Sequence, residues 1–225
     1  MTEYSSSIPD AEERIVATYA DGVTERAEYW LHGNLVGVRW FFETGELQLD
    51  YAVRQGRYHG VFYHCDLPGV LLSATPYVDG LEHGTAYQWD VDGSLLGSYT
   101  MEHGTGLDCW WGRRADGTRI LLEARYYRDG QRHGFEWWLL EDQQHVYEEG
   151  HYANGQPHGI LRVWNRHGRL KRGYPQCYIQ GERVTKARYV RACRHDPTLP
   201  PFRTEDNGPA RIFPPDVAQH LGPPL

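Results

Sequence analysis

An eight-residue phrase occurs three times in this chain, as YVDGLEHG at 77–84, YRDGQRHG at 127–134 and YANGQPHG at 152–159. Its last glycine, taken as an anchor, is matched at Gly37, Gly60, Gly84, Gly104, Gly134 and Gly159. Successive anchors lie about 24 residues apart, a period typical of repeat architectures. One unit is degenerate, because Thr100 stands where its first turn glycine is expected. The chain is therefore predicted to be an array of similar units.

Each unit also contains a second turn. Its glycines are Gly45, Gly69, Gly93, Gly117 and Gly168. In the unit that starts at Gly134, the residues Glu141 to Gln144 (EDQQ) take this place without a glycine. Asp-Gly and Asn-Gly between alternating runs are strong signals for β-hairpins. The 16 Tyr, 8 Trp, 6 Phe and 25 Gly also favour short strands joined by tight turns. We predict an all-β chain in which each unit is strand, turn, strand, turn.

Side-chain alternation predicts which face of these strands is buried. The residues one, three and five positions after an anchor are mostly apolar or aromatic, as in Val38, Trp40, Phe42, then Val61, Tyr63, Cys65, then Thr85, Tyr87, Trp89, then Phe135, Trp137, Leu139. The positions between them are mixed. This pattern predicts a sheet with one buried face.

The repeated glycines and histidines have structural explanations. Gly80, Gly130 and Gly155 are predicted to be turn residues with positive φ, and Gly84, Gly134 and Gly159 to lie at a bulge or close backbone approach. The histidines of the phrase are His59, His83, His103, His133 and His158. A metal or general-base role is the alternative, but equivalent copies lie about 9–10 Å apart in a sheet. We expect each histidine to pack on the neighbouring turn and bond to its backbone.

The composition limits the classes of function. The formal charge is 23 − 30 = −7, which disfavours nucleic-acid binding. Cys65, Cys109, Cys177 and Cys193 form no CxxC pair, so we expect buried thiols in a reducing compartment, with disulfides as the alternative. The N-terminus lacks the features of a signal peptide and no apolar run is long enough to span a bilayer. The expectation is a cytoplasmic protein without direct membrane insertion.

The sequence contains no phosphate-binding glycine loop, GxSxG or HExxH motif. His103, Asp108 and Cys109 lie close in sequence, but Asp108 and Cys109 are predicted to point to opposite faces of a strand. We therefore expect no catalytic residues, no metal and no cofactor. An enzyme with a site in the irregular stretch 104–117 is the remaining catalytic alternative.

The pattern G-x-x-H-G, aromatic, x-x-x-G-x-L, Y-x-x-G resembles the MORN-repeat variant of bacterial proteins, in particular the YwqK-type antitoxin group. The resemblance covers about residues 19–185, with departures at Thr100, at 104–117 and at Glu141 to Gln144. It implies an elongated, twisted antiparallel sheet built from successive hairpins. Because arrays of this kind serve as scaffolds, membrane-associated proteins and antitoxins, the resemblance fixes the fold more than the function.

Three segments follow from these observations: a polar N-terminal segment at 1–14, the repeat array at 15–185, and a capping segment at 186–225. Thr185 is predicted to cap a short helix whose less polar positions are Ala187, Val190, Ala192 and Cys193, ending before Asp196-Pro197. The proline-rich tail that follows is predicted either to wrap along the array or to remain mobile.

The face with mixed residues is the predicted partner-binding surface. Its candidate residues are Arg39, Phe41, Phe62, His64, Glu136 and Trp138. Bulky aromatics bordered by charge resemble interface anchors, and the alternative is that a second sheet layer, the helix or the tail covers them. We expect a protein partner, and the candidate is a basic toxin that an antitoxin or immunity protein would neutralise. The alternatives are a structural scaffold or membrane-proximal adaptor, and a homodimer formed through exposed sheet edges.

Overall fold

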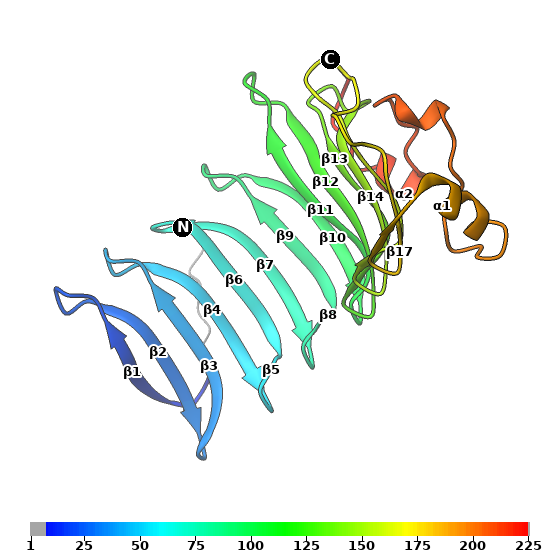
Figure 1. Cartoon of the computed structure of the whole chain (residues 1–225). Coiled ribbons are helices and arrows are strands. Elements are labelled where there is room, and N and C mark those ends of the chain that lie inside the picture. The colour runs from blue at the N-terminus through cyan, green and yellow to red at the C-terminus, as the bar shows by residue number, and fades with distance from the viewer. Residues whose placement is uncertain (1–7, 225) are drawn as a thin grey trace. The chain divides into compact units, whose positions relative to one another are not determined.

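The computed structural model describes residues 8–224 and confirms the all-β hairpin array. Within these residues there are eighteen strands, every pairing given by the register is antiparallel, and consecutive strands are joined by short turns except for the longer connection 164–175 between β16 and β17 (Figure 1). The chain divides into two compact units, Met1–His103 (unit 1) and Gly104–Leu225 (unit 2), which are described separately.

Unit 1 consists of strands and turns in its described part. The strands are β1 (Glu12–Thr18), β2 (Thr24–Leu31), β3 (Asn34–Phe41), β4 (Leu47–Arg54), β5 (Arg57–Tyr58), β6 (Gly60–Leu67), β7 (Val70–Val78), β8 (Leu81–Glu82), β9 (Gly84–Trp89) and β10 (Leu95–Glu102). They pair in chain order, and β5–β6 and β8–β9 are single strands interrupted at a His-Gly pair. The array thus begins at Glu12, inside the segment predicted to precede it.

Unit 2 contains the remaining strands and all helices of the described chain. Its elements are β11 (Thr105–Arg113), β12 (Arg119–Arg128), β13 (Gln131–Leu139), β14 (Val146–Ala153), β15 (Gln156–Pro157), β16 (Gly159–Val163), β17 (Gln176–Ile179), β18 (Glu182–Val184), α1 (Lys186–Ala192), the 3-10 helix η1 (Glu205–Asn207) and α2 (Pro215–Ala218). The Thr185 side chain caps α1 by accepting from Arg188 N–H, as predicted. The side chain that α1 buries is Tyr189, whereas Val190 is 38% exposed.

The turn glycines have the predicted conformation. Gly80, Gly130 and Gly155 have φ of 89°, 75° and 76°, and each follows an Asp or Asn that also has positive φ. Two consecutive residues of positive φ define the hairpin turn that matches the twist of the strands. The anchor Gly134 has φ of 100°, and a Cβ there would lie 3.2 Å from Tyr126 Cβ. Close approach to the preceding strand therefore explains this anchor.

The prediction that Gly104 is the anchor glycine of the degenerate unit was wrong. His103 and Gly104 both have positive φ, so they form the turn, and Thr100 lies inside β10. Gly106 pairs with Tyr127 in the way that Gly134 pairs with Tyr152, which makes Gly106 the anchor. The stretch 104–117 is also not irregular: it holds β11 and an Asp-Gly turn.

Three of the five histidines bond to the backbone of the next turn as predicted, whereas the Nδ1 of His133 has no hydrogen-bond partner within residues 8–224. The Nδ1 atoms of His59, His83 and His158 accept from the N–H of the next turn, at Asp79 (3.4 Å), His103 (3.2 Å) and Gln180 (3.1 Å). Thr105 precedes the anchor Gly106, and its hydroxyl accepts from Asp129 N–H at 3.1 Å. These side chains link successive hairpins, and His103 belongs to a turn instead of this set.

The prediction of one buried face was correct for unit 2 and wrong for unit 1. In unit 2, Trp137, Leu139 and Ile160 are at most 5% exposed, whereas in unit 1 Val61 and Tyr87 are 37% and 42% exposed. A change of register also separates β3 from the later strands, because Trp40, three positions after its anchor, shares a face with His64, four positions after its own. In the pairing of β2 with β3, one residue of β3 has no partner between the pairs Tyr29–Gly37 and Trp30–Leu35. In the pairing of β4 with β5 and β6, the β5–β6 strand has two more residues than β4 over the equivalent stretch. An odd insertion moves every later side chain to the other face.

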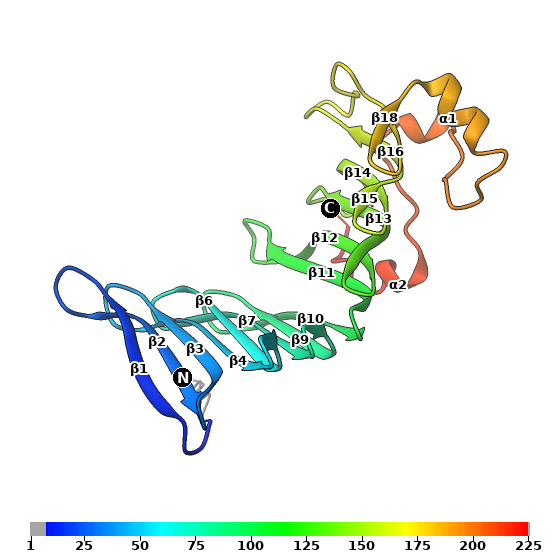
Figure 2. The same ribbon diagram turned by 60° about the horizontal axis from the view of Figure 1, so that its bottom comes forward.

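Unit 2 buries its face because the C-terminal segment 200–224, here called the strap, lies across it. Figure 2 shows the strap in orange and red along one side of the strands of unit 2. Phe213 packs edge-on against Trp137 at 5.6 Å, and Trp164 and Trp111 donate their ring N–H groups to the Asn207 and His220 carbonyls. The tail therefore wraps along unit 2, which was one of the two alternatives.

The residues Glu141 to Gln144, where the repeat pattern breaks, form a turn that contacts the strap. Gln143 has φ of 60° and is 3% exposed. Its side-chain amide accepts from Leu121 N–H and Gly222 N–H and donates to the Leu121 and Leu140 carbonyls. Gln143 thus joins β12, its own turn and the end of the strap.

The cysteines are free thiols, and Cys65, Cys109 and Cys177 are buried. Cys177 belongs to a small core with Ile160, Tyr189 and Leu199, through which α1 caps the last strands. Within residues 8–224, no helix has the length and apolar character that crossing a bilayer requires.

Candidate partner-binding surface

An aromatic cluster occupies one face of unit 1. Phe62 stacks on Tyr51, with ring centroids 5.2 Å apart and planes 2° from parallel. Tyr58 contacts both rings edge-on at 5.5 and 5.1 Å, and Tyr77 lies 5.4 Å from Tyr58. Tyr58 is 41% exposed and the other three rings are half-buried. We call these four residues the aromatic surface.

Strand register extends the aromatic surface along the sheet. Trp40 is directly opposite Leu49, which is opposite His64 on the next strand. Residues directly opposite one another share a face. His64 and Phe62 are two positions apart on β6, so Trp40, His64 and Phe62 face the same way. The structure therefore brings the predicted residues Phe62 and His64 together.

Arg39 and Phe41 do not belong to this surface, which corrects the prediction that the six candidates share a face. Arg39 pairs with Asp50, on the face opposite Trp40. Its guanidinium lies 3.2 Å from the buried Asp50 carboxylate and donates to the Tyr29 hydroxyl. Phe41 follows a register shift and pairs with Leu47. The change of register described above is the physical reason.

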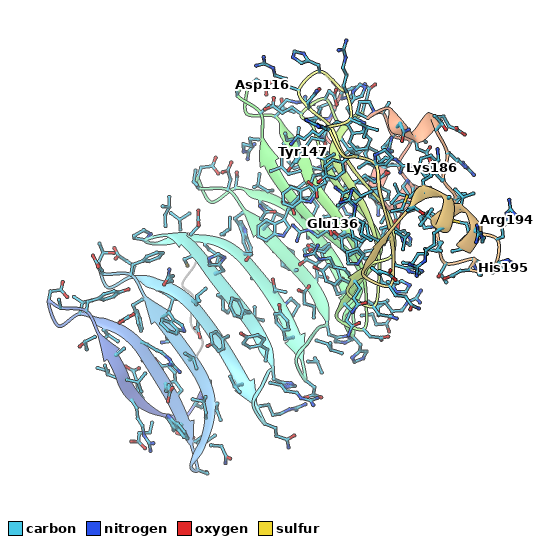
Figure 3. The ribbon with its side chains drawn as sticks, in the orientation of Figure 1. Asp116, Glu136, Tyr147, Lys186, Arg194 and His195 are labelled. Carbon is cyan, nitrogen blue, oxygen red and sulfur yellow. The ribbon has the colours of Figure 1, made fainter. Side chains whose placement is uncertain are left out.

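Glu136 and Trp138 lie on one face of unit 2 within a charged and aromatic network. Glu136 is 7% exposed and accepts from Arg132 at 3.0 Å and from the Trp138 ring N–H at 3.1 Å. The Arg125 guanidinium lies over the Trp138 ring at 5.5 Å, and Tyr147 packs beside that ring at 5.9 Å. Figure 3 labels Glu136 and Tyr147 on neighbouring strands of this face. Glu136 is therefore a largely buried organising residue, and Trp138 and Tyr147 form the accessible part.

The electrostatics of this network favour neutral or positive partners. Burial raises the pKa of the Glu148 carboxyl, and the nearby charge of Glu136 raises it further. Burial and Glu148 also raise the pKa of the Tyr147 hydroxyl. An incoming cation would lower the cost of keeping these carboxylates charged.

Net charge is distributed unevenly between the units. Unit 1 has 5 Lys and Arg against 16 Asp and Glu, so its net charge is 5 − 16 = −11. Unit 2 has 18 against 14, so its net charge is 18 − 14 = +4. The mild overall value of −7 therefore conceals a strongly acidic unit that also bears the aromatic surface.

The cysteine thiols, of which Cys109 was considered as a catalytic nucleophile, have raised pKa values. Burial, followed by the charge of Asp108, raises the pKa of the Cys109 thiol to about 12. Burial similarly raises the pKa of Cys65 to about 11. A thiol with such a pKa is a poor nucleophile near neutral pH. Across residues 8–224, no cluster of three or more His, Cys, Asp or Glu side chains is arranged to hold a metal ion.

Sequence reasoning missed several members of both surfaces: Tyr51, Tyr58 and Tyr77 in unit 1, and Arg125, Arg132 and Tyr147 in unit 2. Tyr58 and Arg132 lie inside the repeated phrase, one position before its histidine. The residue type at this position differs from unit to unit, which could have indicated a surface position. Comparison with known proteins adds no relative: no protein-family model matches the chain, and no curated protein matches it significantly.

Proposed function

We propose that the protein is a non-enzymatic binding protein, an antitoxin or immunity protein that neutralises a basic toxin by covering it with the aromatic surface of unit 1. The observation that carries this proposal is a contiguous cluster of four aromatic rings, one exposed and three half-buried, in a unit with a net charge of −11. Aromatic anchors dominate the energetics of protein interfaces.

The contrast with unit 2 supports the proposal. Unit 2 covers one face of its own sheet with the strap, through contacts such as Phe213 on Trp137. The described part of unit 1 has no helix, and Tyr58 on the aromatic surface is 41% exposed. Exposed apolar area of this kind marks interaction sites. The acidic charge of the same unit steers a basic partner toward it.

Affinity purification of the tagged full chain from its native host tests the proposal. We expect a small basic protein in stoichiometric amount. Recovery of the chain alone, with its own copies or with membrane fragments only, would contradict the antitoxin function and favour a scaffold.

Two matched variants test the surface. Phe62→Ala with Tyr58→Ala removes two anchors, and loss of an anchor costs about 2 kcal/mol or more of binding free energy. The control is Tyr87→Ala, an equally exposed ring on the opposite face of the same sheet. Calorimetry with the purified partner should show weaker binding for the first variant and unchanged binding for the control. The reverse result would place the interface on the other face.

A further inference from the structure

Two turns of the array have equivalent backbones. In unit 1, Gly80 N–H donates to the Tyr58 carbonyl at 2.8 Å. In unit 2, Gly155 N–H donates to the Arg132 carbonyl at 3.0 Å. Tyr58 and Arg132 each directly precede the histidine of the repeated phrase. The side chains around these two turns can therefore be compared position by position.

In unit 1, the turn contains its own anion. The Asp79 carboxylate accepts from Arg54 Nη2 at 2.7 Å and lies 3.6 Å from His59 Nδ1. Asp79 N–H also donates to that His59 nitrogen. The hydrogen bond from Arg54 lowers the pKa of the Asp79 carboxyl. One arginine, one histidine and one carboxylate are thus mutually satisfied.

In unit 2, the corresponding residues are Arg128, His133 and Asn154, so a neutral amide replaces the carboxylate. Arg128 forms no ion pair within residues 8–224, and the buried Nδ1 of His133 has no hydrogen-bond partner there. Burial lowers the pKa of His133, the charges of Arg128 and His158 lower it further, and the nearby Asp129 carboxylate opposes them. The two groups that bind a carboxylate in unit 1 therefore have no hydrogen-bonded or ion-paired carboxylate in the described part of unit 2.

A cavity of about 560 Å³ opens at this position. Arg128, His133, Asn154, Tyr152, Gln156 and Gln180 contribute to its wall. This volume is in the range of sites for small molecules. The cavity also provides amide groups and an aromatic ring for the uncharged part of a ligand.

The other ionisable groups of the wall are already engaged. His158 accepts from Gln180 N–H at Nδ1 and contacts the Thr198 hydroxyl at 3.0 Å through Nε2. The Asp196 carboxylate accepts from the N–H and hydroxyl of Thr198 and lies 3.5 Å from His158. His151 Nδ1–H donates to the His158 carbonyl. Arg128 and His133 remain as the groups available to a ligand.

We propose that this cavity binds a small-molecule oxyanion, a carboxylate or phosphate ester, whose charged group occupies the position equivalent to the Asp79 carboxylate between Arg128 and His133. The remainder of the ligand contacts Tyr152 and Gln156. This site is independent of the toxin-binding function and lies in the other unit of the chain.

The first test is an NMR titration of the full chain with acetate and, separately, inorganic phosphate, with chloride at matched ionic strength as the control. Binding should shift the His133 ring signals in a saturable way and raise the pKa of His133, since an anion favours its protonated form. The anion that binds with the higher affinity, acetate or phosphate, indicates whether the charged group of the ligand is a carboxylate or a phosphate ester. If chloride reproduces the response, or neither anion shifts His133, the proposal is wrong.

The second test restores the carboxylate. Asn154→Asp is compatible with the backbone, because Asn154 and Asp79 have φ of 50° and 52°. It should weaken anion binding at least about tenfold (about 1.4 kcal/mol), because its own carboxylate takes the position of the ligand's charged group. Asn154→Ser is the matched control and should keep the affinity. Asp79→Asn should conversely create an anion response at His59. Unchanged anion affinity in Asn154→Asp would overturn the proposal even if both variants fold normally.

Discussion

The side-chain amide of Gln143 pairs with the backbone of Leu121 in both directions, donating to its carbonyl at 2.9 Å and accepting from its N–H at 2.8 Å. It thereby reproduces, from a side chain, the paired hydrogen bonds of an antiparallel strand. The same Gln143 oxygen accepts from Gly222 N–H in the strap. One residue in a turn therefore helps to hold the end of the strap against β12.

Gln143→Ala should destabilise the protein by about 2–3 kcal/mol, because each buried backbone group left without a partner costs about 1–3 kcal/mol. Gln144→Ala, the exposed neighbour, is the control and should be neutral. Urea unfolding measures both free energies. Equal effects of the two substitutions would show that Gln143 does not hold the strap.

Phe213 and Ile212 are adjacent in the strap but differ in burial, at 9% and 101% exposed. Phe213→Ala should lower the free energy of unfolding by about 3 kcal/mol, since it removes the ring that packs on Trp137. Ile212→Ala should change it by less than about 0.5 kcal/mol. Chemical unfolding followed by tryptophan fluorescence measures both, and a stable Phe213→Ala protein would mean that the strap is dispensable.

The histidines that link hairpins should contribute stability without contributing to binding. His83→Ala removes the bond to His103 N–H and should cost about 1 kcal/mol, the usual net value of a hydrogen bond. His158→Ala should cost about 2 kcal/mol, because that side chain is buried and makes a second bond to Thr198. The exposed His195 provides a neutral control (Figure 3). Loss of partner binding in a folded His83→Ala protein would point to a functional role instead.

Stability should fall as the pH drops below about 6.5. Burial lowers the pKa of His151 and His133 from the ordinary value of 6.5, so in this range the unfolded chain binds more protons than the folded one. Stability from these two groups is complete above pH 6.5 and is lost as the pH falls through their folded pKa values. Denaturant unfolding over this pH range measures the loss. His151→Gln should reduce the slope, and an unchanged slope would contradict the assignment to His151.

A further loss is expected in more acidic solution. Burial raises the pKa of the Glu149 carboxyl, but the hydrogen bond and charge of Arg211, together with Arg162, outweigh burial and leave it below the ordinary value of 4.5. Its contribution is therefore present above pH 4.5 and disappears below. Because Arg211 belongs to the strap, this carboxylate holds the strap on the sheet.

Local sequence was sufficient for the hairpins. Asp129-Gly130 adopts positive φ because the turn requires it, and each equivalent turn has a glycine preceded by Asp, Asn, His or Gln, also with positive φ. The bond from His83 to the next turn and the Thr185 cap were also predictable. Each depends on a conformation or neighbour that the repeat itself specifies. The prediction of Gly104 as an anchor was wrong because in this unit the turn glycine lies only two residues before the true anchor, Gly106. The pair His103-Gly104 was therefore mistaken for the His-Gly pair that ends the repeated phrase.

The candidate surface was less predictable. Phe62 and His64 were placed correctly together, but Arg39 lies on the other face because an odd register shift precedes it. A single inserted residue leaves composition and period almost unchanged, yet it inverts a whole strand. Tyr51 and Tyr77 join Phe62 through contacts between different strands, which alternation along one strand does not reveal.

The sequence by itself determined that this protein is an array of β-hairpins with glycine turns joined by histidines, because those features arise from neighbours within one repeat. The tertiary structure alone decided which face is covered and which is open. Arg211 reaches Glu149 across 62 residues, and Arg114 reaches the Pro223 carbonyl across 109. Contacts over such separations depend on the path of the folded chain, and no local pattern encodes that path.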